Sequence, residues 1–384
     1  MNGIDDEGWL HAPTRDLRSR IDTAFSLQPV LVPFYAILLS FIVGGVLIAL
    51  IGVNPFAAYW ALVRGMVGSP EAIAASIAKS VPYVGSALAL AFAFRAGLFN
   101  IGAEGQLLVG GITAAWVGTW AVLDGAPGIV AIPVILIAGA VGGMMWGGIP
   151  GVLRAQTGAH EVISTIMLNS IALFGVRWLV NSRDPLILRD PEASVPRTRE
   201  ITETGVLPEL VDSTPPLHAG VFVMIGLCFV IAFVLNRTTF GFEVNTVGIN
   251  PHAAHYAGVN VKRIIILAMA IAGACAGLAA AGEVSGTHQT FQPGTYAFIG
   301  FDGIAIALLA RGNPIAILPA SLLWGSLLSG APLMQQEADV SIDVVRIILS
   351  MVLLFVAADA IVRYIFRLKV EGDTQFQATS SGWT

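Results

Sequence analysis

The segment GLFNIGAEGQ, residues 97–106, places Asn100, Glu104 and Gln106 between two long apolar stretches. Their amide and carboxylate groups can hydrogen-bond a polar solute, and the glycines let the backbone leave helical geometry there. A carboxylate in lipid is costly, so Glu104 must face a cavity, a partner or water. Two interpretations stay open: a broken helix lining a path for a solute, or a tight turn in which Glu104 pairs with Arg95 and caps the next helix.

A second polar group lies in GAHEVISTIMLNS, where Glu161, Thr165 and Asn169 follow each other at intervals of four residues. This spacing aligns all three on one helix face. A polar stripe on a membrane helix points into the bundle, so it can line a path or a gate. It can equally make hydrogen bonds between helices, which is the commoner use of such residues.

A third candidate is Asp302 in FDGIAIALLAR, a segment that ends at Arg311. An acidic residue at a helix start and a basic residue at its end both complement the helix dipole. The alternative is that Asp302 lies beside the path for a solute.

The segment GFEVNTVGINPHAAHYAGV, residues 241–259, is too polar and too broken to lie bare in lipid. Asn250 followed by Pro251 is a helix-start signal, and Gly258 is a stop signal. The sequence therefore predicts a short rigid helix over 252–256 at the membrane face. Such a helix is suited to insertion into a groove on another protein.

The elements that must position these residues are membrane helices. Of the 384 residues, 55% are hydrophobic and 12% are charged, whereas soluble domains carry about a quarter charged residues. We expect an all-α polytopic membrane protein, and 42 glycines favour a tight helical bundle. At about 20 residues per span, we expect about ten transmembrane helices, in the runs 30–52, 73–94, 101–123, 128–150, 161–181, 219–236, 263–282, 297–310, 314–332 and 343–362.

The distribution of Lys and Arg predicts that both termini are cytoplasmic. In this topology the first apolar run is itself the insertion signal. The predicted parts are a cytoplasmic N-terminal tail (1–29), a transmembrane domain (30–368) and a cytoplasmic C-terminal tail (369–384). Within the membrane domain we expect an acidic extracytoplasmic loop at 182–217 and a cytoplasmic loop at 237–262.

Several functional classes lack their usual motifs. No GxxxxGK[ST] phosphate loop is present, so the chain does not bind ATP in that way. Cys228 and Cys275 fall inside predicted spans, and His252 and His255 lack a third ligand nearby, so we expect no disulfide and no metal site. No GxSxG, HExxH or paired catalytic carboxylates indicate an enzyme. We also expect no nucleic-acid partner.

The segment GINPHAAHYAGV resembles the coupling-helix signature of permease subunits of ABC importers, in the superfamily of ribose and branched-chain amino acid permeases. GLFNIGAEGQ, HEVISTIMLN and FDGIAIALL are similar to motifs of the nucleoside-importer-like subgroup. The resemblance runs from about Val30 to Arg367. Members usually carry Arg-Ala where this chain has Asn245-Thr246, which affects details of the contact with the ATPase.

The resemblance implies a transport subunit of an ATP-driven importer in the cell (inner or plasma) membrane. ATP would be hydrolysed by a separate cytoplasmic subunit, with no cofactor bound by this chain. A solute-binding lipoprotein would dock outside, and a second permease chain, usually a different one, would complete the path. The candidate path residues are Phe99, Asn100, Glu104, Gln106, Glu161, Thr165, Asn169 and Asp302. The candidate ATPase-coupling residues are Gly248, Asn250, Pro251, Ala253, Ala254, Ala257 and Gly258.

The solute stays open between a nucleoside and a sugar. Aromatic side chains suit a nucleobase, and those available are Phe99, Phe291, Tyr296 and Phe298. A transporter driven by an ion gradient is the alternative function. It would need intramembrane carboxylates that bind protons or sodium. Glu104, Glu161 and Asp302 are candidates, although all three are near predicted helix ends.

Overall fold

The computed structural model describes residues 28–183, 185 and 187–366, so the predicted tails lie almost wholly outside the described residues. The α-helices are α2 (Gln28–Leu50), α3 (Pro55–Val67), α4 (Pro70–Arg95), α5 (Ala103–Gly118), α6 (Gly128–Thr157), α7 (Glu161–Asn181), α8 (Gly220–Arg237), α9 (Thr239–Ile249), α10 (Pro251–Tyr256), α11 (Val261–Glu283), α12 (Ile299–Leu309), α13 (Ile317–Ala338), α14 (Ile342–Ala357) and α15 (Asp359–Ile365). The remaining elements are η1 (Ala121–Leu123), η2 (Glu203–Gly205), η3 (Val284–His288) and an antiparallel strand pair, β1 (Glu209–Val211) and β2 (Leu217–His218).

Seven helices in the described part of the chain are long and apolar enough to cross a membrane. They are α2, α4, α6, α7, α8, α13 and α11 with its extension η3. The other three predicted runs form shorter helices, with 16 residues in α5, 11 in α12 and 16 in α14. The chain is therefore an all-α polytopic membrane protein, as its composition predicts.

Helices α6 and α11 approach each other at glycines. A Cβ atom added to Gly143 would lie 2.2 Å from the carbonyl oxygen of Gly273, and one added to Gly277 would lie 2.2 Å from that of Gly139. Small residues allow such close approach of backbones where lipid supplies no hydrophobic driving force between helices. The glycine-rich composition thus produces the tight bundle that it predicts.

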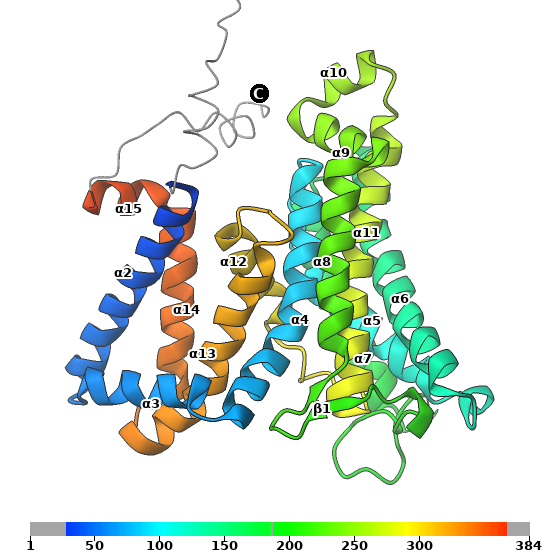
Figure 1. Cartoon of the computed structure of the whole chain (residues 1–384). Coiled ribbons are helices and arrows are strands. Elements are labelled where there is room, and N and C mark those ends of the chain that lie inside the picture. The colour runs from blue at the N-terminus through cyan, green and yellow to red at the C-terminus, as the bar shows by residue number, and fades with distance from the viewer. Residues whose placement is uncertain (1–27, 184, 186, 367–384) are drawn as a thin grey trace, which may run out of the picture.

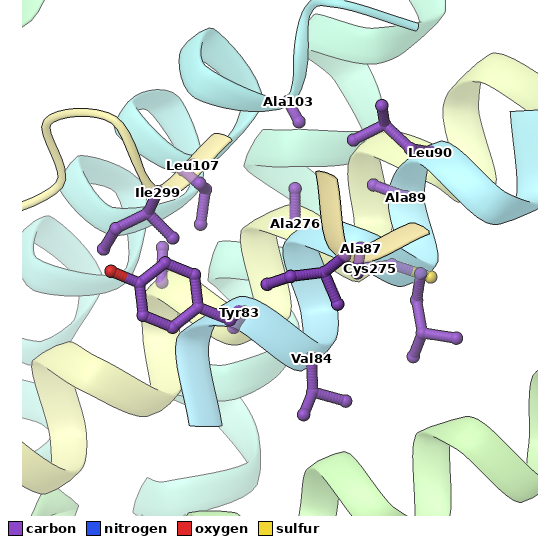
Figure 2. Packing of buried hydrophobic residues seen from close by; sticks show 14 of the residues in the cluster. Tyr83, Val84, Ala87, Ala89, Leu90, Ala103, Leu107, Cys275, Ala276 and Ile299 are labelled. Atoms are coloured by element: carbon purple, nitrogen blue, oxygen red, sulfur yellow. The ribbon is translucent and has the colours of Figure 1, made fainter. Parts of the chain in front are cut away.

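Alanines pack among larger apolar side chains at the junction of α4, α5 and α11, which Figure 2 shows from close by. Ala87 and Ala89 of α4, Ala103 of α5 and Ala276 of α11 are fully buried there. Close packing of this kind has little room for rearrangement. The junction therefore holds the start of α5 firmly against α4 and α11.

The loop at 182–217 and helix α10 lie at opposite ends of the bundle (Figure 1). Backbone hydrogen bonds join the loop to the segment that follows α11. Thr198 N–H donates to the carbonyl of Phe291 at 3.0 Å, and Leu207 N–H donates to that of Ser285 at 2.8 Å. The predicted outer loop is thus joined to the segment that follows α11.

His218, at the end of β2, is buried at this contact. Its Nδ1 accepts the N–H of Gly220 at 3.2 Å, and its Nε2 lies 3.2 Å from the hydroxyl of Thr287. The ring packs so closely on Gly286 that a Cβ there would lie 2.3 Å from Nδ1. Burial, and secondarily the nearby His288, lowers the pKa of His218 to about 4. The contact therefore requires a neutral imidazole.

The predicted loop at 237–262 contains two helices, α9 and α10, where the sequence predicts only α10. Helix α9 is begun by Thr238, whose hydroxyl accepts the N–H of Gly241 at 3.0 Å. Asn245 then donates to the carbonyls of Leu235 at 3.0 Å and Gly241 at 2.8 Å, which ties α9 to the end of α8. Asn245 is therefore a structural residue in this chain.

Candidate functional site

Asn100 and Gln106 form a closed pair at the start of α5. The Asn100 Nδ2 donates to Gln106 Oε1 at 3.0 Å, and Gln106 Nε2 donates back to Asn100 Oδ1 at 3.2 Å. The same Asn100 oxygen accepts the N–H of Gly102 at 3.0 Å. Both side chains are at most 1% exposed. Their hydrogen bonds fix the turn between α4 and α5 in this conformation.

The polar stripe of α7 faces this same turn. Asn169 Oδ1 accepts the N–H of Gly105 at 2.9 Å, and its Nδ2 donates to the carbonyl of Ile101 at 2.9 Å. Thr165 packs its Cβ against the turn, where a Cβ added to Gly102 would lie 3.1 Å away. Asn169 therefore makes the interhelical hydrogen bonds that one interpretation of the stripe predicts, and it satisfies two backbone groups of the broken segment.

Glu161, the first residue of the stripe, is 2% exposed and is paired within the chain. Its Oε2 lies 3.4 Å from Nε of Arg154, near the end of α6. The hydroxyl of Thr165 donates to the Glu161 carbonyl at 2.8 Å. A carboxylate that already faces an arginine is a poor site for a transported cation, because the two positive charges repel.

Glu104 caps the start of α12. Its Oε1 accepts the N–H of Phe298 at 2.9 Å, and its Oε2 accepts the N–H of Gly300 at 2.8 Å. The first N–H groups of a helix lack intrahelical partners, and a carboxylate there complements the positive end of the dipole. The interpretation in which Glu104 pairs with Arg95 is therefore wrong. The carboxylate instead joins α5 to a helix nearly 200 residues away in the sequence.

Asp302 lies one turn further along α12, where its N–H donates to the carbonyl of Phe298 at 2.8 Å. Its side chain is partly exposed and neighbours Trp324 of α13 and Arg346 of α14. Phe298 and Asp302 thus lie one turn apart at the start of α12, with Arg346 within electrostatic range of Asp302. Both interpretations of Asp302, dipole partner and path residue, remain compatible with this place.

The start of α12 lies well inside the thickness of the bundle. Ser86 Oγ, within α4, donates to the carbonyl of Ile299 at 2.9 Å. Ser86 precedes Arg95, the last residue of α4, by nine positions, which corresponds to about 14 Å along a helix. The starts of α5 and α12 therefore meet about 14 Å from that end of α4, rather than at a membrane face.

The four candidate stacking residues differ sharply in exposure. Phe291 and Tyr296 are fully buried and stack on each other with ring centroids 5.3 Å apart, so the prediction that they are available to a nucleobase is wrong. Phe99 is 37% exposed and packs 5.3 Å from the ring of Phe94. Phe298 is 62% exposed and is the most open of the four.

A groove of about 320 Å³ between α5, α6 and α7 lies apart from these polar residues. Apolar side chains such as Ile112, Trp116 and Leu179 supply most of its lining. The groove offers a polar solute few hydrogen-bonding partners and is not the candidate path.

Helix α10 has the local structure that the sequence predicts. Asn250 Oδ1 accepts the N–H of Ala253 at 3.0 Å, Pro251 takes the first position, and Gly258 has φ +86° just past the end. Ala254 is buried against the rest of the chain, while Ala253 points outward. The helix is therefore anchored on one side and open on the other.

We call the exposed apolar residues of α9, α10 and the position after α10 the α10 surface. It comprises Phe242, Ile249, Ala253, Tyr256 and Ala257, all exposed. Gly248 lies on the opposite side, where an added Cβ would meet the carbonyl oxygen of Arg95 at 2.2 Å. The backbone that carries the α10 surface thus rests directly on the turn between α4 and α5.

Over residues 72–357 the sequence matches the protein family described as branched-chain amino acid transport system / permease component. The chain belongs to this family. It is a transport subunit of the ABC permease type and not an enzyme, as the resemblance in its motifs predicts. As a multi-pass permease it resides in the cell membrane.

The permease is similar over most of its length to three curated transport proteins. It is 39% identical to the guanosine ABC transporter permease protein NupP of Bacillus subtilis, over 90% of this chain and 98% of the relative. It is 36% identical to the nucleoside ABC transporter permease protein NupB of Lactococcus lactis, over 87% of this chain and 92% of the relative. It is 31% identical to the glucose ABC transporter permease protein TsgB13 of Haloferax volcanii, over 84% of this chain and 86% of the relative.

A second guanosine ABC transporter permease protein of Bacillus subtilis, NupQ, matches the permease at 25% identity, over 66% of this chain and 79% of the relative. One bacterium thus has two guanosine permease proteins that resemble this chain to different degrees. No solved structure matches the permease significantly.

Proposed function

We propose that this permease forms half of the translocation path of an ATP-driven importer for nucleosides or similar small polar solutes such as sugars. The observation that carries the solute class is its similarity, over about nine-tenths of both chains, to permeases named for guanosine and for nucleosides. The match to a glucose permease at 31% identity keeps sugars within the proposal.

The proposed path passes the polar region where α5 and α12 begin. Glu104 and Asp302 place carboxyl groups inside the bundle, Phe298 is bonded to Glu104 through its backbone, and Phe298 and Phe99 are both exposed. Charged side chains at such depth face a partner or a water-filled space rather than lipid. Asn100, Gln106, Glu161, Thr165 and Asn169 are buried behind them. We assign these five the role of holding the path in shape.

The α10 surface is proposed to receive the cytoplasmic ATP-binding subunit. Its exposed apolar side chains suit a groove on another protein, and Asn250 and Pro251 make the helix rigid before contact. Gly248 packs against the carbonyl of Arg95, beside the turn that leads to Glu104. Movement of the ATPase would therefore be passed to the start of α5. ATP would be used by that subunit, with no cofactor held here.

The topology proposed for the membrane domain, residues 30–368, has ten spans with both termini in the cytoplasm. Helices α5, α12 and α14 would be the three short spans, and two of them begin inside the bundle. This arrangement leaves 182–217 outside and 237–262 inside, in keeping with their places at opposite ends of the molecule (Figure 1).

The remaining proposed partners are a second, different permease chain and an extracytoplasmic solute-binding lipoprotein. The pairing is supported by the two guanosine permease proteins of Bacillus subtilis, which match this chain at 39% and 25% identity.

The experiment that tests the function is uptake of labelled guanosine, adenosine, ribose and glucose into vesicles that contain the permease and its partner subunits. One sample carries an intact ATPase and the other a catalytically inactive one. We expect uptake of one solute class with the intact ATPase only. Equal uptake with the intact and the inactive ATPase, together with loss of uptake when an ionophore is added, would refute the proposal and favour the ion-gradient transporter.

A further inference from the structure

Phe298, the residue just before α12, has a backbone conformation that is unfavourable for its type. Its φ of +71° lies in the left-handed region, which glycine and asparagine enter readily and a bulky side chain enters at a cost of about 1–2 kcal/mol. The ring recovers little of this cost by burial within the chain, because the residue is 62% exposed. Outliers of this kind cluster at functional sites.

The surrounding contacts hold Phe298 in this conformation. Glu104 accepts the N–H groups of Phe298 at 2.9 Å and Gly300 at 2.8 Å, with one carboxylate oxygen each. Gly300 touches the backbone of α5, since an added Cβ would lie 2.2 Å from the amide nitrogen of Glu104. On the other side Ser86 holds the carbonyl of Ile299 at 2.9 Å. The strained residue is therefore fixed at three successive positions.

The ring of Phe298 belongs to a region that does not suit lipid. Asp302 lies one turn along the same helix and is partly exposed, and Arg346 of α14 is within electrostatic range of it. Charged side chains within a membrane bundle face its interior or a water-filled space and pair with one another, rather than facing lipid. Phe298 is thus an exposed aromatic residue one turn before a partly exposed carboxylate, and it lies about 14 Å from the end of α4 along the bundle.

We infer that Phe298 is the platform on which a flat ring of the solute stacks, and that Glu104 is the positioning residue that presents it. The inference rests on the proposed function and deepens it, because a stacking platform favours solutes that carry a nucleobase over the free sugar. Stacking of a base on an aromatic side chain is tolerant of base identity. The platform would therefore accept several nucleosides and discriminate against ribose.

The test compares the uptake KM for guanosine and for ribose in vesicles that hold the complete importer. In the Phe298→Leu variant, we expect the KM for guanosine to rise about 10-fold or more, the size of a lost stacking contact. The KM for ribose should stay within about twofold, and Phe298→Trp should retain guanosine affinity. The matched control is Phe229→Leu, which removes a ring of α8 that is 58% exposed on an apolar helix, and it should change neither KM.

Glu104→Gln tests the positioning role, since it keeps one acceptor oxygen and replaces the other with an NH2 group, which cannot accept the second backbone N–H. We expect it to raise the guanosine KM in the wild-type background and to add nothing to Phe298→Leu, because both changes act through one ring. Simple additivity of the two effects would overturn the positioning role.

An unchanged guanosine KM in Phe298→Leu, with the protein correctly assembled, would overturn the platform while leaving the importer proposal intact. A parallel loss for guanosine and ribose would also overturn it and indicate contact with the second permease chain. Wild-type uptake of ribose without any nucleoside would overturn the platform together with the proposed nucleoside class.

Discussion

The cap of α10 offers a sharp test of coupling, because this helix has only six residues. Isolated helices shorter than about 12 residues are marginal in water, so α10 depends on its Asn250 cap, its first-position Pro251 and the buried Ala254. Replacing Asn250 with Ala removes the acceptor for the N–H of Ala253. Loss of an N-cap costs about 1 kcal/mol, which is about a fivefold change in the ratio of folded to unfolded helix.

We therefore expect Asn250→Ala to lower ATP-dependent uptake by up to about fivefold at unchanged protein abundance. Asn250→Ser should keep most activity because serine also caps, and Asn250→Gly should lose only a few tenths of a kcal/mol. The assay is initial uptake in vesicles together with solute-stimulated ATP hydrolysis. Both rates should fall in the same proportion when coupling is lost.

The matched control is Asn260→Ala. Asn260 caps α11 through the N–H of Arg263 at 3.1 Å, and it is exposed like Asn250. Helix α11 has 23 residues and is held by extensive packing, so the same loss of a cap should leave uptake nearly unchanged. Wild-type uptake by Asn250→Ala, or an equal defect in Asn260→Ala, would refute the reasoning that a rigid α10 is needed for coupling.

Three further outcomes are expected. Gly143→Ala places a Cβ 2.2 Å from the carbonyl oxygen of Gly273, and the overpacking, about 1–3 kcal/mol, should lower the thermal unfolding midpoint. Gly148→Ala on the same helix meets nothing within 4 Å and should leave the midpoint unchanged. Equal midpoints for the two variants would contradict the close crossing of α6 and α11. Burial lowers the pKa of His218 to about 4. The neutral ring therefore contributes about 3 kcal/mol to the free energy of unfolding above pH 6.5, and this contribution is lost as the pH falls toward 4. Proteolysis of the 182–217 loop should accelerate over that range, and much less steeply in His218→Gln. Ala253→Glu puts a charge on the exposed α10 surface and should abolish ATP-dependent uptake without changing the unfolding midpoint; retained uptake would remove this face from the ATPase contact.

Local patterns predict the elements of this molecule well. The ten apolar runs are all helical, and the Asn-Pro start and glycine stop of α10 appear where the sequence predicts them. These signals lie within one turn of the residues that they control. Helix α9 is missed because Gly241 and Asn245 are typical of loops, while the bond that stabilises them comes from the Leu235 carbonyl at the end of α8.

The candidate site is predicted less completely, because its decisive contacts are distant in sequence. Nothing near Glu104 indicates that its partners are the N–H groups of Phe298 and Gly300. Likewise the burial of Phe291 and Tyr296 depends on the return of the chain after η3. Backbone donors carry no residue-type signal, so a single sequence cannot indicate which carboxylate will bind them.

Backbone hydrogen bonds join the 182–217 loop to the segment after α11, so the two regions are held together. Phe291, which is bonded to Thr198 of that loop, is followed within seven residues by Phe298. Any displacement of the 182–217 loop that keeps these hydrogen bonds therefore also moves the segment that leads to the strained residue at the start of α12. The chain thus contains a short mechanical link between the 182–217 loop and the middle of the bundle, with the Glu104 carboxylate as its inner anchor.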